Sequence, residues 1–167
     1  DECGHKLMRV RLPEGHEIEL CNMIVECCSQ ERTYLKYYGL LAERFCRLQL
    51  AWQTLFEQCF VNVYAAVHKI DTVKIRNITK LFGHLLETDA MNWSVLHCVR
   101  LTEADTTAAS RIFLKFLFTE LAESLGQEAL AKRLHSDSLQ QYLTRLFPRD
   151  SLDTLRFSIN FFEAIEL

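Results

Sequence analysis

Turn-forming residues and long apolar runs are both scarce in this sequence. Five glycines and two prolines occur among 167 residues, whereas a small secreted disulfide scaffold is shorter and richer in loops. The richest apolar run, residues 112–118, is interrupted by Lys115 and is much shorter than the roughly 20 residues that span a bilayer. The opening residues DECGHK lack a signal-peptide pattern and look like the start of a fragment cut from a longer chain. We therefore expect no membrane span and a cytosolic or nuclear protein.

The chain also lacks a strong excess of charge of either sign. Its 19 Lys and Arg residues against 22 Asp and Glu residues give a net charge of −3. A nucleic-acid role would therefore need local clustering of Lys and Arg. An apolar content of 49% with 25% charged residues is ordinary for a folded chain, so disorder is not expected. The length predicts one domain, large enough to bury about 70% of its unfolded surface.

Motifs that carry catalysis are missing as well. The sequence has no glycine-rich phosphate loop, no His-Glu-x-x-His and no Gly-x-Ser-x-Gly. Glu103 and Asp105 resemble paired carboxylates, but negative charge at a helix start explains them without chemistry. His97 and Cys98 are adjacent, and adjacent residues rarely form a nucleophile–base pair. We expect no enzyme activity, no cofactor and no small-molecule substrate.

Seven cysteines are present, which is an odd number. The zinc spacing Cys-x-x-Cys does not occur, and the neighbours Cys27 and Cys28 point about 100° apart on a helix. Free cysteine is among the most buried residue types and packs as a small apolar side chain. We therefore predict reduced, metal-free cysteines, with burial of Cys21, Cys27, Cys28, Cys46 and Cys59.

What the sequence has in abundance is apolar spacing of three and four residues, which is typical of amphipathic helices. In the first helix of the pair around residues 21–46, we expect Glu19, Asn22, Glu26 and Ser29 to form the polar face. Thr102 to Asp105 resembles a capping box that opens a helix apolar almost all round, which should be central. The predicted helices lie in residues 1–12, around 21–46 (a pair), 50–70, from the cap Thr72 onward, a short one from Trp93, 102–125 closed by Gly126, 127–135, 138–147, and a last one capped by Asp150 or Ser151.

The fold class that follows is all-α, as a HEAT-like stack of antiparallel helix pairs. Each pair takes roughly 35–40 residues, the period of helical repeat arrays. Gly39 and Gly83 fall inside predicted helices, and we interpret them as sites of close helix crossing. Phe161 and Phe162 lie on neighbouring apolar stripes of the last helix, so we expect that helix to be wedged into the domain.

One cluster of basic residues is the candidate site. Lys69, Arg76, Lys80 and His84 follow one another at steps of seven, four and four, with Lys74 close by. Such a cluster can be a solvated face, a contact surface for an acidic partner, or a site for RNA phosphates. We predict a partner-binding surface formed by Lys69, Lys74, Arg76, Lys80 and His84.

Several long segments resemble the MA-3 (or MI) domain, an all-helical module of translation and RNA-processing scaffolds. Within that family, the sequence more closely resembles the MA-3 domain of the nucampholin (Cwc twenty-two) splicing factors. The segments that carry this resemblance are CNMI (21–24), RTYLKYYGLLAERFC (32–46), KIRNITKLFGHLLETDA (74–90), RLTEADTTAASRIF (100–113), FPRD (147–150) and RFSINFFEAI (156–165).

The resemblance implies a function as well as a fold. It implies that residues 1–167 form a single MA-3 domain, with residues 1–12 as a lead-in helix. It also implies a nuclear, non-catalytic scaffold that binds protein subunits of the spliceosome during pre-mRNA splicing. Two alternatives stay open: a direct RNA-binding module that uses the face from Lys69 to Lys80, and the MA-3 domain of a related nucleolar ribosome-biogenesis scaffold. The sequence shows no aromatic platform for stacking bases, so RNA contact is secondary.

Overall fold

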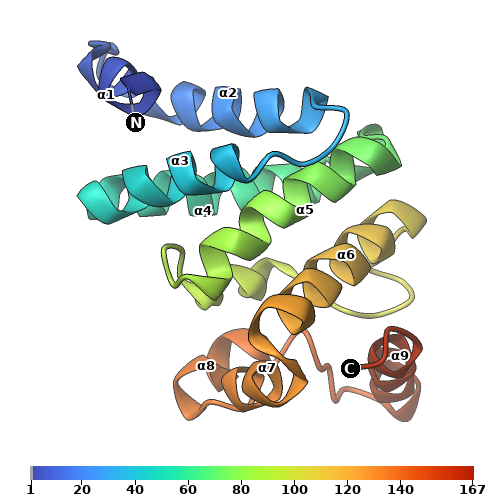
Figure 1. Cartoon of the computed structure of the whole chain (residues 1–167). Coiled ribbons are helices and arrows are strands. Elements are labelled where there is room, and N and C mark those ends of the chain that lie inside the picture. Colours follow the sequence, from blue (N-terminus) through green and yellow to red (C-terminus); the bar gives the residue numbers. More distant parts are fainter. Residues whose placement is uncertain (1) are drawn as a thin grey trace.

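The computed structural model describes residues 2–167 and shows only helices and connections in that range, with no strand (Figure 1). This confirms the all-α prediction. The helices are α1 (Glu2–Arg9), α2 (Glu17–Gln30), α3 (Lys36–Leu48), α4 (Leu50–Ala65), the 3₁₀ turn η1 (Val67–Lys69), α5 (Thr72–Glu87), the 3₁₀ helix η2 (Trp93–Cys98), α6 (Ala108–Leu125), α7 (Gln127–Leu134), α8 (Asp137–Leu143) and α9 (Leu152–Ala164).

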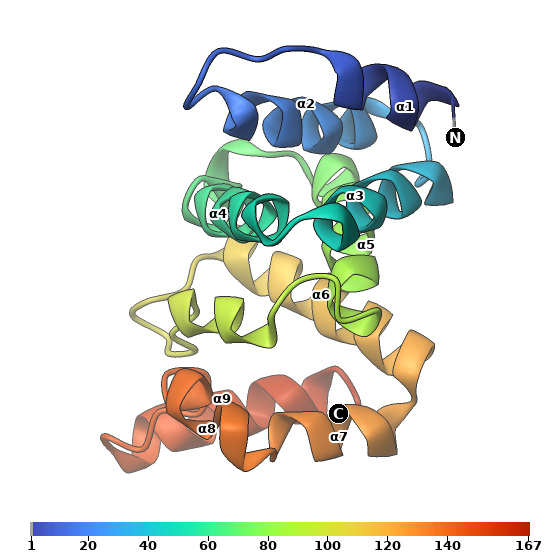
Figure 2. The same cartoon turned by 90° about the vertical axis from the view of Figure 1, so that its left-hand side faces the viewer.

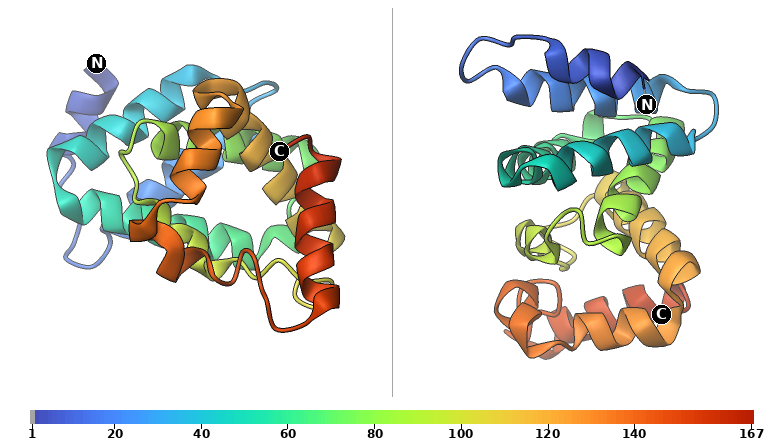
Figure 3. Two further views of the ribbon diagram at one scale, coloured as in Figure 1. Left: turned by 90° about the horizontal axis from the view of Figure 1, so that it is seen from below. Right: turned by 60° about the vertical axis from the view of Figure 1, so that its left-hand side comes forward.

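The helices are stacked in layers along one axis. In Figure 2, α1 and α2 form one end, α3 and α4 lie next to them, and α7, α8 and α9 form the opposite end. The N-terminus and the C-terminus are therefore at opposite ends of the stack. Helices α5 and α6 run through the middle and connect the layers, as the right-hand view of Figure 3 shows. No helix among residues 2–167 is long and apolar enough to cross a membrane.

The core is centred on α5 and α6. The ring of Phe60 on α4 lies edge-on to Phe82 on α5 and to Phe113 on α6, with centroid distances of 5.1 and 5.6 Å. All three side chains are fully buried. Helix α6 also buries Leu114, Leu117, Phe118 and Leu121, which confirms that it is central.

Two helix starts differ from the predicted caps. Helix α6 is capped by Thr107, whose hydroxyl accepts from the Ser110 amide at 3.1 Å, so the predicted start at Thr102 was wrong. Thr102 instead closes a separate turn, because its hydroxyl accepts from the Asp105 amide at 3.0 Å. Helix α5 is capped by Asp71 at 3.0 Å from the Lys74 amide, and the predicted cap Thr72 is its first residue.

The helices predicted over residues 1–12 and 138–147 are too long, because α1 ends at Arg9 and α8 ends at Leu143. Three other boundaries agree with the prediction. Ser151 caps α9 in a capping box with Thr154, Trp93 opens η2, and Gly126 ends α6 with φ at +85°. The predicted helix over residues 50–70 was too long, because α4 ends at Ala65 and η1 follows.

The polar face of α2 was predicted correctly for Glu19, Asn22 and Glu26, which are exposed, but wrongly at its C-terminal end. Ser29 is buried and Cys27 is exposed, the reverse of the prediction. The buried side of α2 is centred on Cys21, Ile24 and Cys28, so Cys27 turns about 100° away from it. All seven cysteines are free thiols, and Cys21, Cys28, Cys46 and Cys59 are buried as expected.

Candidate partner-binding groove

A groove of about 510 Å³ lies between the α2–α3 connection and the N-terminal half of α5. We call it the basic groove, because three cations line it and, among residues 2–167, no carboxylate does. Its lining residues are Arg32, Thr33, Tyr34, Thr72, Val73, Arg76, Asn77 and Lys80.

The wall formed by the α2–α3 connection is fixed to α5 by buried polar contacts. The Asn77 side-chain amide donates to the Glu31 carbonyl at 2.8 Å, and the Cys28 thiol donates to the Asn77 carbonyl at 3.6 Å. The Tyr38 hydroxyl donates to the Glu31 carboxylate at 2.8 Å. Burial, helped by this bond, raises the pKa of Tyr38 to about 12, so the hydroxyl stays protonated. The connection is therefore held in place although it is not helical.

The three cations of the basic groove are held differently. The Arg76 guanidinium lies over the Phe116 ring, 4.9 Å from its centroid. Lys80 is 3.4 Å from the Glu120 carboxylate, which offsets its charge. Among residues 2–167, no carboxylate forms a salt bridge with Arg32 or Arg76 within 4 Å. The groove therefore offers unpaired positive charge that suits a carboxylate or a phosphate.

Only two of the five predicted site residues come together in this groove, Arg76 and Lys80. Lys74 is two residues from Arg76, and two residues turn a helix by about 200°, so Lys74 lies on the other side of α5. Lys69 is exposed on η1, before the chain straightens at Ile70 and α5 begins. The seven-residue spacing between Lys69 and Arg76 therefore does not place them on one face of a helix.

His84, the fifth predicted site residue, is not on the surface. It is 9% exposed, with Nε2 at 2.7 Å from the Glu43 carboxylate and Nδ1 at 3.4 Å from the Glu87 carboxylate. Burial alone would raise the pKa of Glu43, but hydrogen bonds from His84 and Arg47 outweigh it and lower that pKa. His84 links α3 to α5 and is buried, so it lies apart from the groove lined by Arg76 and Lys80.

Arg32 was missed by the sequence reasoning. Arg32 lies two residues after the end of α2 at Gln30, and a cation in the short connection between two amphipathic helices was the signal in the sequence that could have identified it. What the sequence does not show is that this connection folds against the first two turns of α5, next to Arg76 and Thr72.

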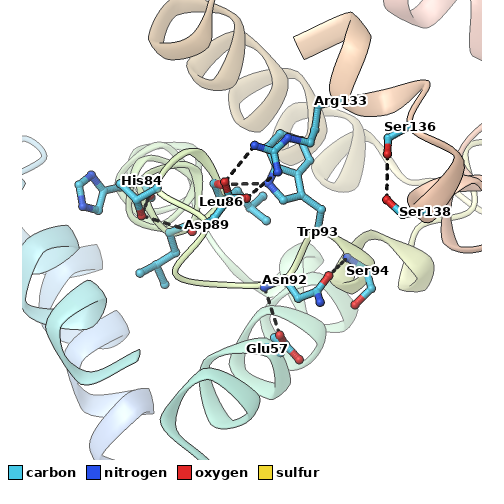
Figure 4. Close-up of polar contacts among 12 residues, drawn as sticks. Glu57, His84, Leu86, Asp89, Asn92, Trp93, Ser94, Arg133, Ser136 and Ser138 are labelled. Atoms are coloured by element: carbon cyan, nitrogen blue, oxygen red, sulfur yellow. Dashed lines mark hydrogen bonds and ion pairs between the residues drawn. The ribbon is translucent and has the colours of Figure 1, made fainter. Parts of the chain in front are cut away.

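A larger cavity, about 680 Å³, lies between the residues after α5 and the α7–α8 pair (Figure 4). The Arg133 guanidinium binds both carboxylate oxygens of Asp89, at 2.6 and 2.9 Å, and lies 5.2 Å from the Trp93 ring centroid. The Trp93 indole N–H donates to the Leu86 carbonyl at 2.9 Å. The charged residues that line this cavity already have partners, because Arg133 pairs with Asp89, and Lys132 pairs with Glu128 at 2.9 Å. We therefore interpret the cavity as a contact region between layers and not as a binding site.

Comparison with known proteins identifies the family. The profile of the MA3 domain matches residues 1–92. The pre-mRNA-splicing factor cwf22 of Schizosaccharomyces pombe is 55% identical over all 167 residues, which cover 19% of its length. The CWC22 homologues of Drosophila melanogaster and Homo sapiens are 50% and 48% identical over the same 167 residues, which cover 13% and 18% of their lengths.

The chain thus spans less than a fifth of the length of these relatives, and its similarity to them is continuous from the first residue to the last. This confirms the resemblance to splicing factors of the CWC22 type. Together with the stacked helices and the profile match over more than half of the chain, it leads to one conclusion: the chain belongs to the MA3 domain family.

Proposed function

We propose that this chain is the protein-binding MA3 domain of a nuclear pre-mRNA-splicing factor, and that it joins protein subunits of the spliceosome without catalysing a reaction. The observation that carries this proposal is the 48–55% identity to splicing factors over the whole chain. A stack of helices with grooves along its sides is also the kind of architecture that helical repeat proteins use for binding.

We further propose that residues 1–167 act as one folding unit, although the family profile ends at residue 92. The support is that the core continues past this point. Phe82 lies before it and Phe113 after it, and both rings pack on the same Phe60. Cutting the chain after residue 92 would expose this aromatic cluster to water.

The contact surface in this proposal is the basic groove, and its occupant is an acidic segment of a partner protein. Arg32 and Arg76 supply unpaired charge from two walls, and Thr33 and Thr72 supply hydroxyl groups between them. Val73 is 58% exposed at the edge and offers an apolar contact. Charge complementarity of this kind mainly determines which partner binds and how fast.

RNA binding is the second candidate, because the same unpaired cations suit phosphates. The groove has one aromatic side chain in its lining, Tyr34, and its hydroxyl is packed inward against Gly39. Proteins that bind single strands usually stack several bases on aromatic side chains. The protein partner is therefore the better supported of the two.

The test is a charge reversal, Arg76→Glu with Lys80→Glu, in the full-length protein. We expect circular dichroism to show an unchanged helix content and incorporation into spliceosomal complexes to fall several-fold. Arg149→Glu with Arg156→Glu is the matched control, because it makes the same charge change at exposed positions outside the groove. Normal incorporation of the Arg76/Lys80 variant would exclude the basic groove as the contact surface.

RNA binding is tested on the same variants with the free protein. We expect weak binding of single-stranded RNA by the unmodified protein, and no difference between the groove variant and the control. Tight, salt-sensitive binding that only the groove variant loses would favour the RNA-binding function instead.

A further inference from the structure

A second groove, of about 460 Å³, lies on another side of the molecule, between α2 and the segment from α4 to α5. We call it the acidic groove. Its lining residues are Glu19, Asn22, Met23, Val25, Glu26, Val63, Ile70 and Ile78.

The floor and the far wall of the acidic groove are apolar. Val25 and Ile78 are buried at 5% and 3% exposure, and Val63 and Ile70 are half-buried. Met23 stands at the edge with 45% of its surface exposed. A methionine side chain is flexible and polarisable, so it adapts to the shape of whatever packs on it. An apolar groove with such an edge is a surface that gains free energy when a partner covers it.

The edge of the acidic groove that α2 forms is polar and negatively charged. Glu19, Asn22 and Glu26 follow one another at steps of three and four, so they form a single row along α2. Glu19 contacts His16 at 3.1 Å, and Glu26 accepts from the Gln30 amide at 2.6 Å. Within residues 2–167, no lysine or arginine forms a salt bridge with either carboxylate. Both carboxylates are therefore available to a cationic partner, and they would repel RNA phosphates.

We propose that the acidic groove binds an amphipathic helix of a protein partner that carries Lys or Arg beside its apolar stripe. Glu19 and Glu26 are seven residues apart, which is about 10.5 Å along α2. That length matches two turns of a partner helix, whose residues i, i+3 or i+4, and i+7 enter the apolar floor. The cations of that helix lie against Glu19 and Glu26.

The acidic groove is separate from the basic groove and shares no lining residue with it. Arg76 and Lys80 line the basic groove, whereas Ile78 lines the acidic groove from the opposite side of α5. Two partners of opposite charge can therefore be held at the same time, one on each side of α5. In that arrangement the domain is a bridge between two proteins, and loss of one contact leaves the other intact.

The first experiment places a photo-crosslinking amino acid, p-benzoylphenylalanine, at position 23 of the full-length protein in assembled splicing complexes. Mass spectrometry then identifies the crosslinked segment. The expected product is a protein segment with apolar residues at helical spacing flanked by Lys or Arg. Crosslinks to RNA, to an acidic segment or to a second copy of this chain, or no crosslink at all, would overturn the proposal.

The second experiment measures binding of a synthetic peptide with the sequence of that segment. Met23→Lys and the pair Glu19→Lys with Glu26→Lys should each weaken binding about tenfold or more, because the first places a cation on the apolar edge and the second reverses the charge of the acidic row. Reversing the peptide's cations to Glu should restore binding to the Glu19/Glu26 variant.

Leu152→Lys is the control for Met23→Lys, because Leu152 is 73% exposed on α9, outside the groove. An affinity within twofold of the unmodified protein for Met23→Lys would contradict the proposal, and the Arg76→Glu/Lys80→Glu variant should bind this peptide normally.

Discussion

At the scale of single residues, the contact that sets how closely α3 approaches α5 is made by Gly39. A Cβ atom at this position would overlap the Tyr34 hydroxyl and would lie 3.1 Å from the His84 ring. His84 is itself held between Glu43 and Glu87 and cannot move freely. The missing side chain of Gly39 is therefore what allows a tyrosine and a histidine to fill the space between two helices.

Replacing Gly39 by Ala should destabilise the protein. Alanine gains up to about 1 kcal/mol in helix propensity, but overpacking in a tight site costs about 1–3 kcal/mol. We expect a net loss of about 1–2 kcal/mol in the free energy of unfolding, measured by chemical denaturation. The same change in a Tyr34→Phe background should cost less, because the overlapping hydroxyl is gone. An equal loss in both backgrounds would show that Tyr34 does not limit the approach.

At the scale of elements, the last helix, α9, is held on the rest of the domain mainly by the buried side chain of Phe162. Phe162 is 7% exposed and packs on Phe118 of α6 and on Phe147, with centroid distances of 5.1 and 5.0 Å. Phe161 is only half-buried and lies edge-on to Phe162. Arg111 of α6 adds a contact with the Phe157 ring at 5.1 Å. The two adjacent phenylalanines, which have equal apolar character in the sequence, therefore differ in what they stabilise.

Truncating these two residues should give different losses of stability. Phe162→Ala should cost about 3–5 kcal/mol, the usual range for a buried phenylalanine. Phe161→Ala should cost clearly less, because part of its ring already contacts water. Thermal unfolding of both variants measures the difference. Equal losses would mean that Phe161 is buried in solution, and no loss for either would mean that α9 is not packed on the domain.

At the scale of the whole molecule, the layers are joined through α5, α6 and the connection that follows α5. Asp89 lies in this connection with a positive φ of 55° and binds Arg133 of α7 (Figure 4). Arg133 also covers the ring of Trp93, which is 2% exposed. The Arg133 side chain of α7 thus contacts both the turn after α5 and the start of η2.

Removing the Arg133 side chain should therefore lower the free energy of unfolding more than removing the charge of Asp89. The ion pair is partly exposed, and such pairs contribute about 0–1 kcal/mol. We expect Asp89→Asn to cost less than about 1 kcal/mol and Arg133→Ala about 1–2 kcal/mol, since the cation–π contact is lost too. Hydrogen exchange should also become faster in α7 and α8 of the Arg133→Ala variant. Equal costs for the two variants would show that the contact with Trp93 contributes nothing.

The sequence by itself determined the class of fold, most of the helices and the family. Apolar spacing is a property of consecutive residues, so the central helix ending at Gly126 and the last helix starting at Ser151 were predictable locally. Hydroxyl and carboxylate residues near a helix start compete for the cap, so spacing alone could not choose Thr107 over Thr102 or Asp71 over Thr72.

Only the tertiary structure decided which of the regularly spaced side chains face water and which of them meet. Lys74, Arg76, Lys80 and His84 are all polar residues of one helix, but α3 covers His84 and the connection at Arg32 meets only Arg76 and Lys80. Burial and proximity depend on the elements that pack on a helix from distant parts of the chain. For that reason the sequence indicated a cluster of basic residues on α5, while the fold determined which of them line the basic groove and which residues line the acidic groove on the other side.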